Sequence, residues 1–169
     1  MFESVLEQVT PDHAGLPTPC EGWDVATLVQ HLLDGHRRVI AAAGGTPPDI
    51  DDGDQLSSFR TLAAAAQAVF DAPDGLTRPF ELPFGVVPGA VFAAIRSGDG
   101  YAHAWDLATA IGADTDLDPE VGEAVAAATS PFLSPALRGD GKPFGPEQPC
   151  PEDRPIADRY AAFVGRRVS

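Results

Sequence analysis

The feature that most constrains the fold of this chain is an apolar stripe with helical periodicity over residues 25–43. Apolar side chains that recur every three to four residues share one face of a helix, and this face needs a packing partner. Asp24 is a suitable N-cap, and Gly44-Gly45 followed by Pro47-Pro48 ends the pattern. The stripe comprises Val25, Leu28, Val29, Leu32, Leu33, Ile40 and Ala43.

Other segments have the same helical character, and alternating strand patterns are nearly absent. We expect further helices over residues 54–71, 88–111 and 120–129, with short ones over 2–9 and 156–164. Residues 15–22 and 139–155 are predicted loops. Residues 75–88 contain prolines that exclude a central strand, which leaves an extended connection or a short edge hairpin. The pattern favours an all-α bundle.

Length and charge exclude several classes of protein. The 169 residues fit one domain, 1–169, with a self-sufficient core. A net charge of −14 argues against nucleic acid or an anionic membrane as a partner. No apolar run approaches the ~20 residues that span a bilayer, and no secretory signal is visible. Two distant cysteines do not make a disulfide framework, so we expect a cytoplasmic, reduced protein.

One pair of side chains suggests chemistry. Asp99 and His103 are four residues apart on the predicted helix over 88–111, which places them one turn apart on one face. A carboxylate and an imidazole are ordinary ligands for zinc or another divalent first-row metal. Asp106 is placed to accept the second ring N–H of His103. Gly98 and Gly100 flank Asp99, which indicates a close approach to the backbone or tight helix packing.

The sequence offers two histidines as a third ligand. Both His31 and His36 lie on the predicted helix over residues 25–43. His36 falls within the apolar stripe, whereas His31 lies about 60° outside its edge at ~100° per residue. Periodicity alone therefore favours His36 as the inward histidine. Cys20 is more simply interpreted as a small buried residue than as a nucleophile. Trp23 and Trp105 are interpreted as core or pocket-wall aromatics.

Two runs resemble a known family. The first is Thr18-Pro19-Cys20-Glu21-Gly22-Trp23-Asp24-Val25, followed by Leu28-Val29-Gln30-His31-Leu32, and the second is the segment over residues 99–108. Together they resemble the N-terminal domain of mycothiol-dependent maleylpyruvate isomerases, which belongs to the DinB-like superfamily of metal-binding four-helix bundles. Residues 82–89 and 144–147 resemble a single-domain, mostly actinobacterial branch. The resemblance implies a four-helix bundle with a short extra terminal helix and an extended loop between helices three and four.

The resemblance also implies a ligand set. The family's first histidine corresponds to His31, and its acid-x-x-x-His pair corresponds to Asp99 and His103. His36 stays as the alternative ligand that periodicity favours. The isomerases carry Glu where this chain has Asp99, and they have a C-terminal domain for which this chain shows no counterpart. Both departures weigh more against isomerase activity than against the metal site.

Three protein ligands leave open positions on a divalent ion, as in catalytic sites. The resemblance implies Zn²⁺ or Ni²⁺ as the metal and a low-molecular-weight thiol, mycothiol, that acts as a thiolate on an electrophilic substrate. The expected function is thus a thiol-dependent transferase or isomerase-like enzyme. The alternatives are a non-catalytic metal or small-ligand binding module and a metal-dependent hydrolase. A homodimer is compatible with such bundles, although no interface can be read from the residues.

Overall fold

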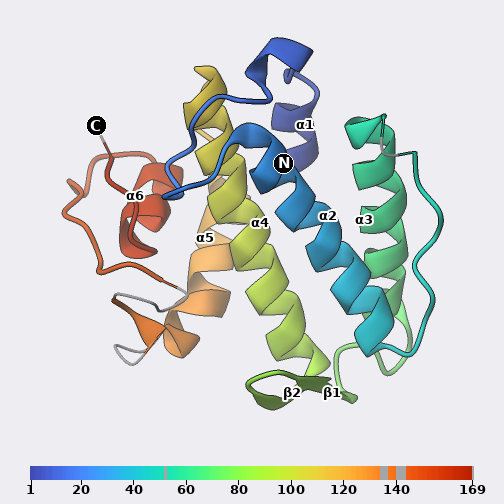
Figure 1. Cartoon of the computed structure of the whole chain (residues 1–169). Helices are drawn as coiled ribbons and strands as arrows, with labels where there is room; N and C mark the ends of the chain where they lie inside the picture. Colours follow the sequence, from blue (N-terminus) through green and yellow to red (C-terminus); the bar gives the residue numbers. More distant parts are fainter. Residues whose placement is uncertain (52, 134–136, 140–143, 169) are drawn as a thin grey trace. The chain divides into compact units, whose positions relative to one another are not determined.

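The computed structural model describes residues 1–51, 53–133, 137–139 and 144–168. The protein is mostly helical, with 56% of the described residues in helices. The long helices are α2 (Val25–Ala42), α3 (Gln55–Asp71), α4 (Gly89–Ile111) and α5 (Pro119–Thr129), and the short ones are α1 (Phe2–Leu6) and α6 (Ile156–Phe163) (Figure 1). The described residues also include two 3-10 turns, η1 (Pro11–His13) and η2 (Ser130–Phe132).

The helix ends follow the capping residues of the sequence. Asp54 accepts a hydrogen bond from the Ser57 backbone N–H at 2.9 Å, and Asp118 caps α5 through the first backbone N–H groups of that helix. Gly112 adopts a positive φ of 69° directly after α4, as a C-terminal cap requires. The first helix is shorter than predicted, since it ends at Leu6 and the chain then turns. The predicted loop over 139–155 lies partly outside the described residues.

The connection between α3 and α4 is the short hairpin that the sequence left open, and not the extended loop that the family resemblance implies. It forms an antiparallel hairpin of β1 (Pro79–Leu82) and β2 (Gly85–Pro88), so the chain is mostly helical and not purely α. Phe80 is 1% exposed, and its ring packs edge-on against Phe92 and tilted against Phe70. Burial of this one aromatic fixes the hairpin against the helices that precede and follow it. Pro79 and Pro88 stand at the outer ends of the two strands, where the ladder tolerates them, and Pro83 lies in the turn between the strands.

The chain divides into two compact units. The first unit consists of Met1–Ala26 and Ser97–Ser169, and the second consists of Thr27–Arg96. Helices α2 and α4 each run from one unit into the other without a break. The second unit has an apolar interior formed by residues from α2, α3, the hairpin and the start of α4: Leu28, Val29, Leu32, Phe59, Leu62, Phe80 and Phe92. None of the described helices combines the length and apolar character of a membrane span.

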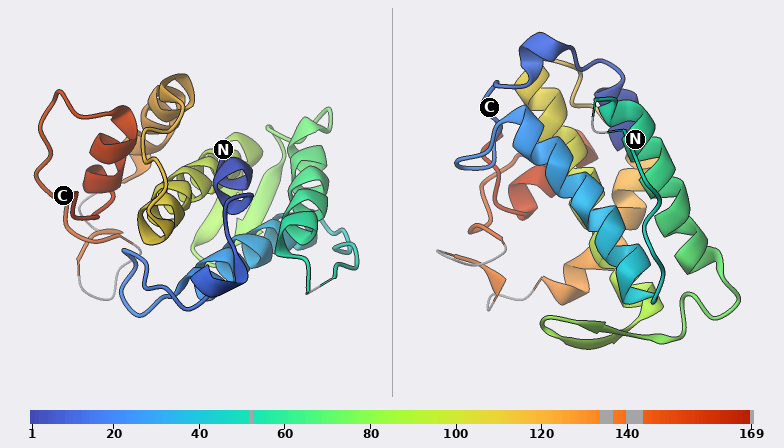
Figure 2. Two further views of the ribbon diagram at one scale, coloured as in Figure 1. Left: turned by 90° about the horizontal axis from the view of Figure 1, so that it is seen from above. Right: turned by 45° about the vertical axis from the view of Figure 1, so that its right-hand side comes forward.

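In the first unit, polar contacts and small residues join three helices. The Trp105 indole N–H of α4 donates to the buried carboxylate of Asp158 in α6 at 2.8 Å. Thr129 at the end of α5 shares a hydrogen bond of 3.1 Å with the Tyr160 hydroxyl of α6. These two residues lie so close to Gly98 of α4 that a Cβ there would be 2.6 Å from the Tyr160 hydroxyl. Helices α5 and α6 also lie side by side, as the left view of Figure 2 shows. The C-terminal half of α4 is therefore held in a fixed setting.

Candidate metal centre

The loop that precedes α2 is a tight hydrogen-bonded turn. The Thr18 hydroxyl accepts from the Cys20 backbone N–H at 3.2 Å and donates to the Trp23 carbonyl at 3.0 Å. The Thr18 N–H also donates to the Trp23 carbonyl at 3.0 Å, which closes the turn. Gly22 has a φ of 77°, a conformation that glycine adopts without steric cost. The Thr-Pro-Cys-Glu-Gly-Trp run therefore holds Cys20 and Trp23 in fixed positions.

Helix α4 brings the predicted pair together. Asp99 Oδ1 lies 3.4 Å from His103 Nε2, and the side chains are 25% and 7% exposed. The Trp23 ring stacks on the imidazole, with 5.7 Å between ring centroids and 21° between the planes. The imidazole of His103 therefore cannot rotate freely, and its Nε2 atom is directed to the same side of the helix as the Asp99 carboxylate.

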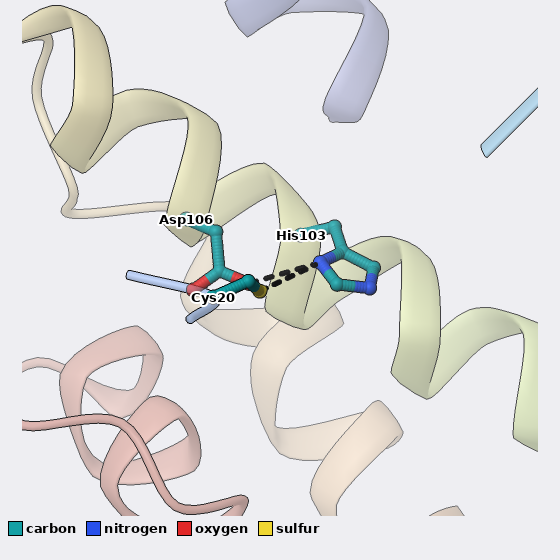
Figure 3. Close-up of side chains that lie close together, drawn as sticks. All are labelled: Cys20, His103 and Asp106. Atoms are coloured by element: carbon teal, nitrogen blue, oxygen red, sulfur yellow. Dashed lines mark hydrogen bonds and ion pairs between the residues drawn. The ribbon is translucent and has the colours of Figure 1, made fainter. Parts of the chain in front are cut away.

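The other nitrogen of His103 faces a buried network. Nδ1 lies 2.9 Å from Asp106 Oδ2, and Asp106 is fully buried. The Cys20 thiol donates to the same carboxylate oxygen at 3.2 Å and lies 3.9 Å from His103 Nδ1. Figure 3 shows the three side chains converging, with the loop cysteine beside the contact between the two residues of α4. Asp106 thus occupies the place that the sequence predicts, beside the second ring nitrogen.

Arg166, just after α6, completes the network. Its Nε donates to Asp106 Oδ1 at 3.2 Å, and one terminal nitrogen donates to Asp106 Oδ2 at 2.9 Å. The same terminal nitrogen lies 3.3 Å from Cys20 Sγ. A guanidinium that contacts both oxygens of one carboxylate forms the strong, planar type of ion pair.

These contacts determine the charges of the site. Burial alone would lower the pKa of His103, but hydrogen bonds to Asp106, Asp99 and Cys20 outweigh it and raise that pKa to about 11. Burial raises the pKa of Asp106, yet the hydrogen bonds from His103 and Arg166 and their charges hold it below its usual range. Asp106 is therefore an ionised acceptor, and the Nδ1–H of His103 donates to it. A metal ion would displace only the proton on Nε2.

The network does not have the geometry of a nucleophilic triad. In such a triad the nucleophile and the acid bind opposite nitrogens of the histidine. Here Cys20 and Asp106 both face Nδ1. A Cys–His–Asp mechanism of that type is not supported.

Potential ligand atoms of Cys20, His103 and Asp106 lie within 4.8 Å of one another, which by itself would suit a metal ion. The Arg166 guanidinium already supplies a positive charge to both the sulfur and the carboxylate. A second cation among these three side chains would be repelled. The donor set that fits a divalent ion without this conflict is on the Nε2 side of His103, where Asp99 lies.

The two histidines of α2 belong to the second unit. His31 is half-buried and stays a predicted ligand. His36, the alternative, packs its ring edge-on against Phe59 with 5.1 Å between centroids, within that unit. His36 therefore has an aromatic packing partner on the apolar side of its helix.

Two members of the network were not predicted from the sequence as site residues. Cys20 is half-buried and its thiol donates a hydrogen bond to a carboxylate, which corrects the expectation of a buried apolar residue. Its place in the loop directly before α2 was the only signal. Arg166 had none, because it is 60 residues from Asp106 along the chain.

Comparison with known proteins places the chain in a family. The family model described as the mycothiol maleylpyruvate isomerase N-terminal domain matches residues 2–108. Two proteins of Mycobacterium tuberculosis, from strains CDC 1551 / Oshkosh and ATCC 25618 / H37Rv, are each 44% identical over 169 residues. Each alignment covers 99% of this chain and 92% of the relative, and both relatives are described as uncharacterized. No solved structure matches the chain.

Proposed function

Because the chain belongs to the mycothiol maleylpyruvate isomerase N-terminal domain family, we propose that it binds a divalent metal through His31, Asp99 and His103. The observation that carries the proposal is that each ring nitrogen of His103 faces a different carboxylate. Its Nε2 faces the Asp99 carboxylate at 3.4 Å, and its Nδ1 is held by the buried Asp106 at 2.9 Å. A metal-ligating histidine has this arrangement, with one nitrogen for the metal and the other bound to a carboxylate.

We propose a DinB-like four-helix bundle of α2, α3, α4 and α5 in a single domain over residues 1–169. The family match over residues 2–108 includes parts of both compact units, which supports one domain. The continuity of α2 and α4 supports it as well.

The proposed activity is thiol chemistry, as a transferase or isomerase-like enzyme acting on an electrophilic substrate. A bound Zn²⁺ or Ni²⁺ would lower the pKa of a low-molecular-weight thiol such as mycothiol and keep it as a thiolate. The chain's own residues supply the rest. Asp99 and His103 hold the ion, Asp106 fixes the His103 ring through Nδ1, and Trp23 covers one face of that ring. With three protein ligands, positions on the ion stay open for the thiol.

The first test is metal content and affinity. We expect the purified protein to bind one Zn²⁺ or Ni²⁺ per chain, measured by elemental analysis and calorimetric titration. His103→Ala and His31→Ala should abolish stoichiometric binding, whereas His36→Ala should retain it. Asp99→Glu should retain binding because it keeps the carboxylate, and Asp99→Asn should weaken it. Full metal binding by His103→Ala would overturn the assignment, and loss in His36→Ala with retention in His31→Ala would select the alternative histidine.

The second test separates an enzyme from a binding module. The metal-loaded protein is incubated with mycothiol and a panel of electrophilic acceptors, and thiol consumption is followed. Turnover that disappears in His103→Ala supports the proposed enzyme. Stoichiometric metal without thiol binding or turnover would contradict it and favour a non-catalytic module. Hydrolysis of acceptors without any thiol would identify a metal-dependent hydrolase instead.

A further inference from the structure

The backbone at the end of α6 fixes the position of Arg166. Gly165 has a φ of 104°, and its N–H donates to the Ala162 carbonyl at 3.0 Å. The Arg166 N–H donates to the Ala161 carbonyl at 2.9 Å. These two bonds around a left-handed glycine form a Schellman motif, which fixes the direction of the chain after the helix. The backbone of Arg166 is therefore part of the helix cap.

The guanidinium of Arg166 is fixed as firmly as its backbone. Two of its nitrogens bind the two oxygens of Asp106, and the third donates to the Val164 carbonyl at 3.3 Å. The Arg166 side chain is 15% exposed and that of Asp106 is not exposed at all. Removing one partner of such a buried ion pair is costly, because the charge of the other partner then stays buried without compensation.

The fixed guanidinium of Arg166 also fixes Asp106 and, through Asp106, the ring of His103. A carboxylate bound at both oxygens by a planar fork cannot turn about its own axis. Oδ2 of Asp106 then stays 2.9 Å from His103 Nδ1 and accepts its proton. Without Arg166, the carboxylate would lose both bonds to the fork and could move away from the ring.

We propose that Arg166 is a positioning residue that fixes Asp106, and through it the orientation in which His103 directs Nε2 toward Asp99. Arg166 lies beyond residues 2–108, so the family match does not assign it a role. The contact of Arg166 with Cys20 Sγ at 3.3 Å extends the same effect to the loop that carries Trp23. The C-terminal segment thus supports the ring of His103 through Asp106 and through the loop that carries Cys20. The inference rests on the proposed metal site for its functional meaning, but its geometry can be tested in the metal-free protein.

The test compares three variants of adjacent arginines. Arg166→Gln removes the charge and the fork, Arg166→Lys keeps the charge but loses the fork, and Arg167→Gln removes the same charge from an exposed neighbour. Zn²⁺ affinity is measured by competition with a chromophoric chelator. We expect about a 10-fold loss for Arg166→Gln, in the range found for outer partners of metal-binding histidines. Arg166→Lys should lie between it and the wild type, and Arg167→Gln should match the wild type.

A second readout does not need the metal. In metal-free wild-type protein, the Nδ1–H proton of His103 is buried against Asp106 and should give a downfield, slowly exchanging NMR resonance. This resonance should broaden or disappear in Arg166→Gln and persist in Arg167→Gln. Circular dichroism verifies that each variant is folded, and Arg166→Lys serves if Arg166→Gln does not fold.

The outcomes separate the two proposals. If the wild type binds no metal, the proposed function fails, while loss of the resonance in the Arg166 variants still supports the positioning role. If folded Arg166→Gln and Arg166→Lys keep both the wild-type metal affinity and the resonance, the positioning role is overturned. Equal losses in Arg166→Gln and Arg167→Gln would also overturn it, because they would reflect net charge alone.

Discussion

At the scale of single residues, the electrostatics of the site converge on Asp106. Its Oδ2 accepts hydrogen bonds from the His103 ring, the Cys20 thiol and the Arg166 guanidinium. A fully buried carboxylate without such partners would be strongly destabilising. Because the partners come from three separated parts of the chain, one carboxylate joins the loop before α2, helix α4 and the end of α6.

Tyr101, which lies between the two predicted ligands on α4, gives a pH prediction. Burial and the negative charges of Asp118 and Asp116 raise its pKa from 10.0 to about 12. The unfolded chain ionises this tyrosine first, so the free energy of unfolding holds below pH 10 and falls as the pH rises through about 12. Tyr101→Phe removes this loss, and its stability should fall less over that interval.

The measurement combines denaturant unfolding at several alkaline pH values with the ultraviolet absorbance of tyrosinate. The chain has only two tyrosines, and burial also raises the pKa of Tyr160. Little tyrosinate should therefore form near pH 10 while the protein is folded. Tyrosinate formation at that pH with an unchanged helical circular dichroism signal would contradict the prediction. Tyr160→Phe is the matched control, because it removes the other tyrosine and leaves Tyr101 in place.

From the sequence, contacts of the site could be predicted only between residues that are neighbours on one helix. Asp99, His103 and Asp106 follow from the helical repeat, and α4 places them on one side as that repeat requires. Cys20 and Arg166 lie 83 and 60 residues away from their partners on α4, and no local pattern encodes such contacts. A thiol and a guanidinium near a metal-type histidine could be found only once the fold was known.

At the scale of elements, the helices were predictable because their ends carry explicit signals. Asp54, Asp118 and Gly112 each make the capping geometry that their residue type favours. The hairpin was less predictable, because prolines weaken the sequence pattern of a strand. The stability of the hairpin also depends on the packing of Phe80 against the rings of Phe70 and Phe92. That contact belongs to tertiary packing and has no counterpart in the local sequence.

The two glycines that flank Asp99 in α4 give an element-scale prediction with opposite signs. A Cβ at Gly98 would lie 2.6 Å from the Tyr160 hydroxyl and 2.8 Å from Thr129 Cγ2, whereas a Cβ at Gly100 would have no neighbour within 4 Å. Gly98→Ala should therefore lower the free energy of unfolding by roughly 1–3 kcal/mol through overpacking. Gly100→Ala should raise it by about 0.5–1 kcal/mol, because alanine is the better helix former.

Denaturant unfolding followed by circular dichroism measures both effects. Each variant is the control for the other, since both place the same methyl group on the same helix. Of the two interpretations that the sequence left open, close packing accounts for Gly98. Nothing in the structure explains Gly100. Destabilisation of both variants to the same degree would show that helix propensity and packing have been wrongly assigned.

At the scale of the whole molecule, the main question is whether the two compact units unfold together. Helices α2 and α4 run through both units, so neither unit can lose its helices without breaking hydrogen bonds that continue into the other. Both tryptophans, Trp23 and Trp105, lie in the first unit, and Phe80 lies in the core of the second. Fluorescence of the wild-type tryptophans can therefore report on damage made in the other unit.

Phe80→Ala should destabilise the whole chain by about 3–5 kcal/mol, the usual cost of removing a buried phenylalanine ring. If residues 1–169 form one domain, tryptophan fluorescence and far-ultraviolet circular dichroism should both shift to the same lower denaturant midpoint, as two-state unfolding requires. Gly98→Ala, in the first unit, should likewise leave the two probes coincident. A fluorescence transition that stays at the wild-type midpoint in Phe80→Ala, while the helical signal is lost earlier, would mean that the units unfold independently. The proposed single domain would then have to be divided, and the proposed ligands His31 and His103 would belong to separately folding parts.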